Sequence, residues 1–263
     1  MACLSRAKSD RIAKEKMGNR QLTVPFLRAI RYNRFLEQAG MRKGGDGMTD
    51  RVTIAAPCLF GLESILAGEM KRLGMTDIEV RDGRVTCKGD VADVFRLNLH
   101  LRTAERVLID LGSFEARSFE ELFVGVRALP WEDFIGSLDA FPVKGWSLHS
   151  QLHSIPDCQS IVKKAVVERL KSHYAVEWFE ETGPLHQIRF SIHKDRVTLS
   201  LDTSGPGLHK RGYRQLSAEA PIKETLAAGI VDLAHVRGDT LVCDPFCGSG
   251  TLVIEAELHA LRI

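Results

Sequence analysis

The sequence predicts a modular α/β chain (α+β modules), and three observations lead to this class. Residues 52–111 carry strand and helix patterns in the order βαββαβ. Residues 119–201 continue the alternation of helical and strand patterns in a different order. Residues 241–258 combine an apolar segment, a glycine turn and a helix start, which is how a Rossmann-like fold begins. The length of 263 residues suggests roughly two domains.

The first module has a local signal for each of its elements. Gly74 is placed to end a helix, Asp82-Gly83 is typical of a hairpin turn, and Asp90 is typical of a helix N-cap. The expected elements are strands at 52–57, 77–81, 84–88 and 106–111, with helices at 61–73 and 91–97. This order is that of a ferredoxin-like unit.

The second module and the connector after it follow from the same patterns. We expect helices at 119–129 and 131–135, a strand at 140–152, an amphipathic helix at 158–174, and strands at 186–191 and 196–201 paired across a Lys194-Asp195 turn. A polar, glycine-rich connector at 202–220 leads to a helix that begins at Pro221. The buried face of that helix is expected to hold Ile222, Leu226, Ile230 and Leu233.

The glycine turn has the chemistry of a ligand-binding loop. Gly248 and Gly250 would let backbone N–H groups approach a ligand closely, after a buried strand at residues 241–243. Asp244, at the strand end, can accept a hydrogen bond from a ligand amine or hydroxyl. A bare Gly-x-Gly is weak evidence, because many βα turns contain one for packing alone.

The residues around these glycines resemble a known family. The run Asp244-Pro245-Phe246-Cys247-Gly248-Ser249-Gly250-Thr251 closely resembles the first cofactor motif of class I S-adenosylmethionine-dependent RNA methyltransferases. Residues 208–214 and 220–228 resemble the linker and first helix of one branch, which joins an RNA-binding THUMP domain to the methyltransferase domain. Residues 57–116, 142–145 and 159–170 resemble the earlier modules of that branch. Over residues 51–263 the chain is similar to the bacterial large-subunit ribosomal RNA guanine-N2 methyltransferases.

The resemblance implies a ferredoxin-like unit plus a THUMP-like domain, followed by the start of a Rossmann-like methyltransferase domain. The expected division is a basic N-terminal extension at 1–47, the ferredoxin-like unit at 48–116, the THUMP-like RNA-binding region at 117–203, a linker at 204–220 and the first part of the methyltransferase domain at 221–263. The extension carries eleven Lys and Arg against four Asp and Glu. It is expected to be disordered or to precede a start at Met48, with a basic arm on RNA as the alternative.

The same resemblance implies a site for S-adenosylmethionine. Asp244, Pro245, Cys247, Gly248, Ser249 and Gly250 would surround the methionine and ribose parts of this cofactor, with Thr225 and Leu226 lining the same pocket. The family's substrate motif, Asn or Asp followed by Pro-Pro and an aromatic, has no match in a chain without Pro-Pro. Nor does the chain reach the acidic ribose-binding residue expected ~20 residues after the glycines. We therefore expect a truncated catalytic domain, unassigned catalytic residues and no methyl transfer by the isolated chain. A second chain or a dimer would complete the domain.

Two groups of residues are candidates for RNA contact. Lys210, Arg211, Tyr213 and Arg214 combine cations with an aromatic, as phosphate neutralisation and base stacking require, although an exposed linker has the same composition. Lys144, Ser147, Ser150, Lys163 and Lys164 would approach the RNA backbone on a THUMP-like scaffold. The lysine pair alone is more typical of a solvated helix face.

Composition excludes several classes of protein. The net charge of +2 limits any nucleic-acid surface to a local patch. No apolar stretch approaches the roughly 18 residues of a membrane span, so no membrane role is expected. Six scattered cysteines without a Cys-x-x-Cys pair predict a reduced, cytoplasmic protein and no metal site. His149 and His153 lie in a strand-like stretch and are interpreted as surface residues.

Two functions remain open. The first is that of an RNA-binding member of a family that transfers methyl from S-adenosylmethionine to a base in RNA, with guanine N2 of large-subunit ribosomal RNA as the expected target. The alternative is a non-catalytic RNA-binding module. A thiouridine-forming enzyme with a THUMP domain is disfavoured, because Asp244-Pro245-Phe246-Cys247 does not look like its pyrophosphatase loop.

Overall fold

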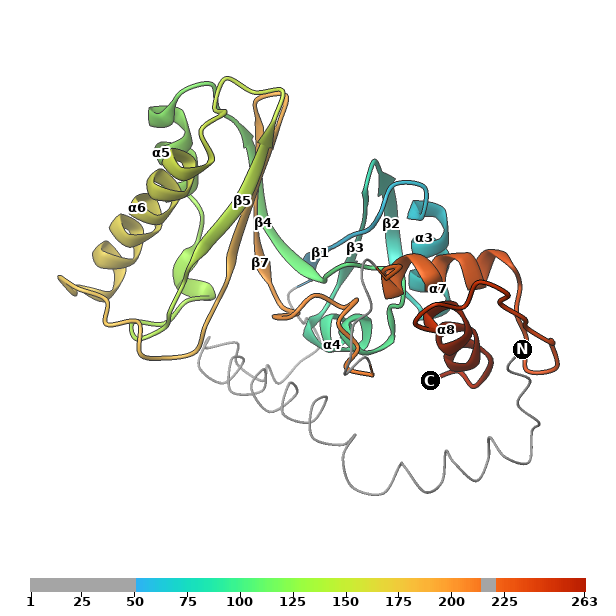
Figure 1. The fold of residues 1–263 in the computed structure, drawn as a ribbon. Helices are drawn as coiled ribbons and strands as arrows, with labels where there is room; N and C mark the ends of the chain where they lie inside the picture. The colour runs from blue at the N-terminus through green and yellow to red at the C-terminus, as the bar shows by residue number, and fades with distance from the viewer. Residues whose placement is uncertain (1–50, 214–220) are drawn as a thin grey trace.

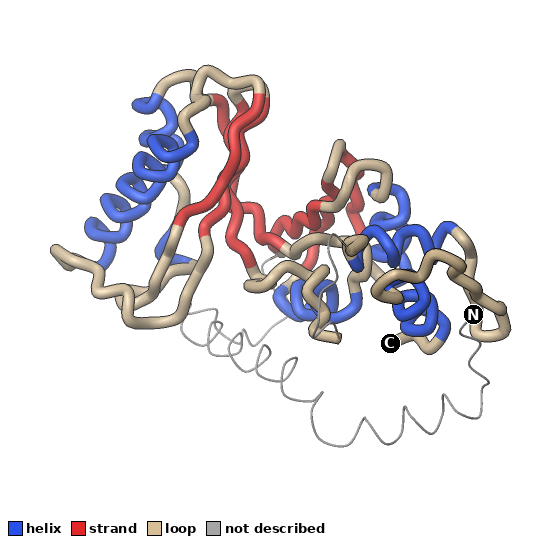
Figure 2. Tube along the Cα trace, in the orientation of Figure 1, coloured by secondary structure: helices blue, strands red, loops and turns tan. Residues whose placement is uncertain are grey.

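A computed structural model describes residues 51–213 and 221–263, and the expected extension at 1–47 lies outside them. The described part is a mixed α/β structure, as the sequence predicts (Figure 1). Strands of two lobes meet near the middle of the molecule, with helices packed beside each group of strands (Figure 2).

The first module is a ferredoxin-like unit, as expected. Its elements are β1 (Val52–Pro57), α3 (Glu63–Arg72), β2 (Thr76–Arg81), β3 (Arg84–Gly89), α4 (Val91–His100) and β4 (Leu108–Glu115). The strands lie in the order β2-β3-β1-β4, and all neighbours are antiparallel. Asp90 caps α4 as predicted, since its carboxylate accepts the Asp93 N–H at 2.9 Å and the Asp93 carboxylate accepts the Asp90 N–H at 3.0 Å.

The second module adds three strands and two α-helices. They are α5 (Phe119–Arg127), a 3₁₀ turn η1 (Trp131–Asp133), β5 (Val143–Leu148), α6 (Ile155–Tyr174), β6 (Ile188–His193) and β7 (Arg196–Asp202). β6 and β7 form the expected antiparallel pair, whereas β5 is parallel to β6 and shorter than the predicted strand. α6 begins three residues earlier than expected, because Pro156 fits the first turn of a helix.

Strand β4 joins the two modules into one seven-stranded sheet. The sheet order is β2-β3-β1-β4-β7-β6-β5. Residues 108–110 of β4 pair with β1 on one side and with β7 on the other. The sequence patterns predicted two separate modules and contained no sign of this shared strand. Figure 1 shows β4 running from the first lobe into the second.

The hydrophobic core lies on one face of this sheet. Ile54, Ile109, Leu201 and Ile188 are aligned across β1, β4, β7 and β6, and all four are buried. The first belongs to a cluster with α3 and α4, and the last to a cluster with α5 and α6. All four helices therefore pack on the same face, and the opposite face is left without a covering helix of the described modules.

The C-terminal part consists of two helices, α7 (Glu224–Leu233) and α8 (Thr251–Ala260), which pack on each other beside α3. The predicted buried face of α7 is wrong at Ile230 and Leu233, which are 41% and 61% exposed, whereas Leu226 packs against the core of the first module as expected. Small residues face inward instead, and a Cβ at Gly229 would lie 2.6 Å from a Leu62 methyl group. Close approach of α7 to the first module selects small side chains over large ones.

The buried strand expected before the glycine turn is also absent from the described residues. Leu241 is 84% exposed, and residues 241–244 have no strand pairing. A strand needs a neighbouring backbone for its N–H and C=O groups, and no described strand lies beside this segment.

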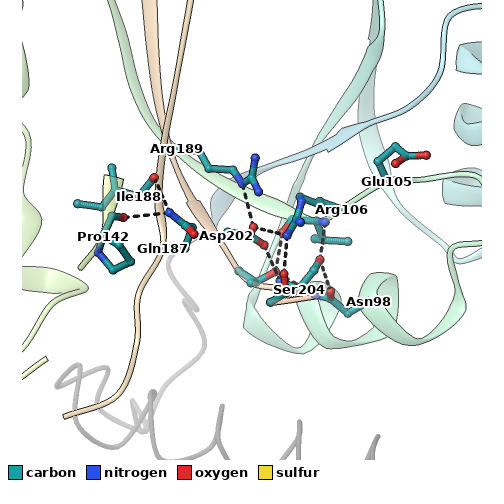
Figure 3. A network of polar contacts seen from close by, with 12 residues as sticks. Asn98, Glu105, Arg106, Pro142, Gln187, Ile188, Arg189, Asp202 and Ser204 are labelled. Carbon is teal, nitrogen blue, oxygen red and sulfur yellow. Dashed lines mark hydrogen bonds and ion pairs between the residues drawn. The ribbon is translucent and has the colours of Figure 1, made fainter. Parts of the chain in front are cut away.

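A polar network closes the junction between the two modules (Figure 3). The Asp202 carboxylate, 1% exposed, accepts hydrogen bonds from Arg106 at 2.5 Å and from Arg189 at 2.9 Å. The Ser204 hydroxyl donates to Asn98 Oδ1 at 2.7 Å and accepts the Val107 N–H at 2.8 Å. These bonds connect the end of β7 to α4 and to the start of β4.

We expect Asp202→Asn to destabilise the junction. Two arginines would lose their shared counter-ion at a buried site, and removal of one partner of a buried pair costs about 3 kcal/mol. Urea denaturation followed by circular dichroism measures this loss in the free energy of unfolding. The control is Glu115→Gln, an exposed carboxylate opposite Arg196 on β4, which should change stability by less than about 0.5 kcal/mol. Equal losses in the two variants would contradict the role of Asp202.

Candidate functional site

The glycine turn gathers six of the predicted cofactor residues in one short loop. Gly248 and Gly250 have φ of +50° and +76°, a region that favours glycine. The Asp244 carboxylate accepts the Phe246 N–H at 3.0 Å, and Gly250 N–H donates to the Cys247 carbonyl at 2.7 Å. No side chain caps α8 at Gly250. The loop thus presents a carboxylate and a helix N-terminus within a few residues of each other.

Most of this loop faces solvent in the described structure. Pro245, Cys247, Gly248 and Ser249 are exposed, while Asp244 and Gly250 are partly buried. The neighbouring Phe246 is 93% exposed. The turn therefore has the local geometry of a ligand loop, with open space above the glycines.

Thr225 and Leu226 have partners other than the glycine turn. The Thr225 side chain is fully buried, and its hydroxyl donates to Glu105 at 2.6 Å. Leu226 packs against the core of the ferredoxin-like unit. These contacts attach α7 to the first module, and the lining of a cofactor pocket by Thr225 and Leu226 stays a prediction.

Glu105 is a residue that the sequence patterns did not single out. Its carboxylate accepts the Thr225 hydroxyl and lies 3.6 Å from Lys223 Nζ and 3.4 Å from His209 Nδ1. Its backbone carbonyl accepts the Leu208 N–H at 2.9 Å. One loop residue of the first module thereby holds both the connector and α7. Only long-range contacts identify it, so no local pattern could have found it.

Arg211 and Tyr213, predicted to contact RNA, both bond to Glu255 of α8. Arg211 donates to one carboxylate oxygen at 2.6 Å, and the Tyr213 hydroxyl donates to the other at 2.8 Å. Arg211 also donates to the backbone carbonyl of Arg102. Glu255 is fully buried. This cluster fastens α8 to the connector and to the end of α4, and contact of Arg211 and Tyr213 with RNA stays a prediction.

Burial controls the protonation of this cluster. Burial raises the pKa of the Glu255 carboxyl, and the hydrogen bonds from Arg211 and Tyr213 oppose the rise. Burial also raises the pKa of the Tyr213 hydroxyl, and the nearby Glu255 adds to this rise. Lys210 remains exposed beside the cluster, and Arg214 lies outside the described residues.

The other RNA candidates do not form one patch. Lys144 and Ser147 are three residues apart on β5 and point to opposite faces, and the Ser147 hydroxyl is buried without a hydrogen-bond partner. The Ser150 hydroxyl donates to Asp195 at 2.8 Å. Lys163 and Lys164 lie on α6, across the sheet from the open face that carries Lys144.

Lys163 also has intramolecular partners. Its ammonium lies 3.5 Å from the centre of the Phe141 ring, donates to the Phe141 carbonyl at 3.2 Å and pairs with Glu181. Lys163 therefore contributes to the structure of its own module, and its contact with RNA stays a prediction, while Lys164 and Lys144 are exposed.

The described residues also bear on metals and membranes. Among residues 51–213 and 221–263, no group of three or more His, Cys, Asp or Glu is placed to hold a metal ion. Within the same part of the chain, no helix has both the length and the apolar character to cross a bilayer.

Comparison with known proteins agrees with this arrangement of modules. Three family models match the chain in order: the RlmL ferredoxin-like domain at 53–108, the THUMP domain at 116–202, and the RMKL-like methyltransferase domain at 211–263. Over these three consecutive matches the chain is similar to THUMP-domain RNA methyltransferases.

Curated members of the family are longer than this chain. The "Putative RNA methyltransferase YpsC" of Bacillus subtilis (strain 168) is 47% identical over 81% of this chain and 56% of its own length. The "Ribosomal RNA large subunit methyltransferase K/L" of Psychromonas ingrahamii is 35% identical over 79% of this chain and 28% of its own length. The chain thus spans about half of the first relative and less than a third of the second.

Solved structures of similar proteins share the fold. A Listeria monocytogenes protein, described as a "predicted N6-adenine-specific DNA methylase", has a TM-score of 0.78 at 46% identity, covering 87% of this chain and 58% of its own. SMU.472, "a putative methyltransferase complexed with SAH", has a TM-score of 0.76 at 41% identity, covering 81% of this chain and 56% of its own.

We expect Arg211→Met to destabilise the chain far more than Lys210→Met. The first change leaves the buried Glu255 carboxylate without its cation, which costs about 3–5 kcal/mol. The second removes an exposed charge and should cost less than about 0.5 kcal/mol. The free energy of unfolding in urea measures the effect of each substitution. Because Arg211 and Lys210 are adjacent cations, Lys210→Met is a matched control for Arg211→Met. Similar losses would show that the Arg211 ion pair does not stabilise the structure.

The loss of unfolding free energy caused by Arg211→Met should depend on pH. The folded-state pKa of Glu255 lies above its ordinary value near 4.5, so the neutral carboxyl is the form that burial favours. The stability deficit is fully present above the folded-state pKa and shrinks as pH falls through it toward the ordinary value. Unfolding free energies at about pH 8 and about pH 5 measure this change. The double variant Arg211→Met, Glu255→Gln has no such carboxyl and should lose the dependence.

Proposed function

We propose that this chain recognises RNA of the large ribosomal subunit and is part of an enzyme that methylates N2 of a guanine in that RNA. The observation that carries the proposal is the attachment of a THUMP-containing sheet to a cofactor-motif turn through Glu105 and the Glu255 cluster. The name of the ribosomal relative supports the RNA class. The choice of guanine N2 rests on the resemblance of the motifs over residues 51–263.

The residues of the turn fit S-adenosylmethionine in the part of the site that is described. A Cβ added at Gly248 would make an ordinary van der Waals contact with the Phe246 carbonyl oxygen at 3.8 Å, so no described atom crowds this position. The Asp244 carboxylate can accept a hydrogen bond from an ammonium group, and the N-terminus of α8 attracts a carboxylate. These are the two charged groups of an amino-acid moiety.

Methyl transfer to an amine depends mainly on the positioning of the donor and the acceptor. S-adenosylmethionine held by Asp244 and the glycine turn would supply a methyl group from a positively charged sulfur to the guanine amine, which would lose a proton as S-adenosylhomocysteine leaves. Alignment and exclusion of water account for much of such rate enhancement. A base in a helix would have to leave its stack to reach the methyl group. The modules before the turn would choose and hold the RNA while Asp244 and the glycines hold the donor.

A second function, that of a non-catalytic RNA-binding module, is favoured by the exposure of the turn. Leu241 and Phe246 face solvent, and the described residues place no strand beside them. Calorimetric titration of the 263-residue chain distinguishes the two functions: binding of S-adenosylmethionine that is lost in Asp244→Ala supports a donor site. RNA binding without any cofactor affinity supports the non-catalytic module.

We expect that cells without the gene for this chain lack one N2-methylguanosine in large-subunit ribosomal RNA. Mass spectrometry of nucleosides from that RNA, with and without the gene, measures the change, and reintroduction of the gene should restore it. Loss of an N6-methyladenosine instead would replace guanine by adenine as the target. Unchanged RNA nucleosides would contradict the proposed function.

A further inference from the structure

The face of the sheet opposite the helices carries a polar row across all seven strands. The register aligns one residue from each strand: Lys144, Arg189, Ser200, Asp110, Thr53, Lys88 and Thr76. None of them is apolar, although neighbouring positions on the other face are buried hydrophobics. The row is suited to a solvated ligand where it is exposed, and the same face also carries the buried Ala55 and Leu108 and the exposed Leu148.

Beside this row lies an exposed tryptophan. Trp146 is 50% exposed and is aligned with Ser191, Thr198 and Ser113 on β6, β7 and β4. The tryptophan is thus the one large aromatic in a line of hydroxyl side chains. An indole held on a strand presents a flat apolar surface at little entropic cost. Such a surface suits stacking of an unpaired base, because every base has a flat face that can stack.

Cations lie on both sides of the tryptophan row. Lys144, two residues before Trp146 on the same face, has no hydrogen bond or ion pair with any described residue. Arg189, opposite Lys144, shares the buried Asp202 with Arg106, so two positive charges face one carboxylate. On the far side of the row, Arg196 donates to Ser113 at 3.0 Å from an exposed position.

The carboxylates on this face are largely neutralised near the tryptophan. Asp202 is 1% exposed and paired as above, and Asp110 accepts Arg84 at 2.7 Å and the Ser200 hydroxyl at 2.6 Å. Glu115 is an exposed carboxylate on this face and lies directly opposite Arg196, so it offsets part of the Arg196 charge. Lys144, which has no partner among the described residues, is the cation left beside Trp146, as phosphate binding requires.

We propose that this open sheet face, defined by Lys144, Trp146, Arg189 and Arg196, binds an unpaired segment of RNA with one base stacked on Trp146. This inference takes its RNA substrate from the proposed function. It adds the surface on which the RNA lies and the single-stranded form in which the RNA is bound. Lys144 and Arg196 contact phosphates on either side of the stacked base. Duplex RNA is disfavoured, because its bases are not free to stack on a side chain.

The test compares two exposed tryptophans. Trp146→Leu keeps an apolar side chain but removes the stacking surface, and it should weaken binding of a single-stranded oligonucleotide from large-subunit ribosomal RNA about 5- to 100-fold. Trp178→Leu, at an 81% exposed tryptophan in the loop after α6, should leave the affinity unchanged. Fluorescence anisotropy with a labelled oligonucleotide measures both, and circular dichroism verifies that both variants are folded.

A second variant examines the phosphate contacts. Lys144→Ala should lower the slope of log affinity against log salt by about 0.7. Lys171→Ala, at an exposed lysine near the end of α6 on the helix-covered side, should leave the slope unchanged. A wild-type chain that prefers a duplex of the same sequence would overturn the stacking of a base on Trp146.

The outcomes separate this inference from the proposed function. Wild-type RNA binding that survives both Trp146→Leu and Lys144→Ala would overturn the open face as the site and leave the proposed function standing. A wild-type chain without affinity for the RNA would overturn both. If Trp146→Leu left RNA affinity unchanged but abolished concentration-dependent self-association, the exposed edge of β5 would be a protein contact, and the RNA assignment would fail.

Discussion

The structure depends on one shared strand. Because residues 108–110 of β4 bond to β1 and to β7, the ferredoxin-like unit and the THUMP region are parts of a single sheet and do not need a flexible linker between them. Because β4 is shared, buried polar groups on both sides of this strand need hydrogen-bond partners at the junction. Asp202, with two arginines and the Ser204 N–H, provides those partners at the point where β7 ends.

The start of the methyltransferase domain is attached to this sheet by polar contacts from short segments. Glu105 follows α4 and holds α7 through Thr225, while Arg211 and Tyr213 in the connector hold α8 through Glu255. Both attachments are buried or nearly so, and a buried charge requires its partner at close range. The orientation of the glycine turn is therefore linked to the sheet that carries the RNA-binding candidates, which is what site-specific modification of a large RNA requires.

The sequence predicted the elements well because each has a local cause. The Asp90 cap, the Asp82-Gly83 turn and the apolar periodicity of α3 and α6 act within a few residues, and all of them appear in the structure. What failed depends on distant segments. The buried face of α7 is set by the approach of Leu62 to Gly229, and the strand before the glycine turn needs partners that the described residues do not provide. The hydrogen bond from Arg211 to Glu255 joins residues 44 positions apart, so no local pattern could have predicted it.

The cations discussed above fall into two groups: those paired with a buried carboxylate, and those with no carboxylate partner among the described residues. Arg106, Arg189 and Arg211 each contact a buried acid, so the scaffold uses part of their charge. Lys144 lacks such a partner among the described residues, and it lies on the sheet face that no described helix covers. A basic residue without a folded acid partner keeps its full charge for RNA, whereas a paired one such as Arg189 offers only part of it. With a net charge of only +2, this difference decides where an anionic polymer can bind.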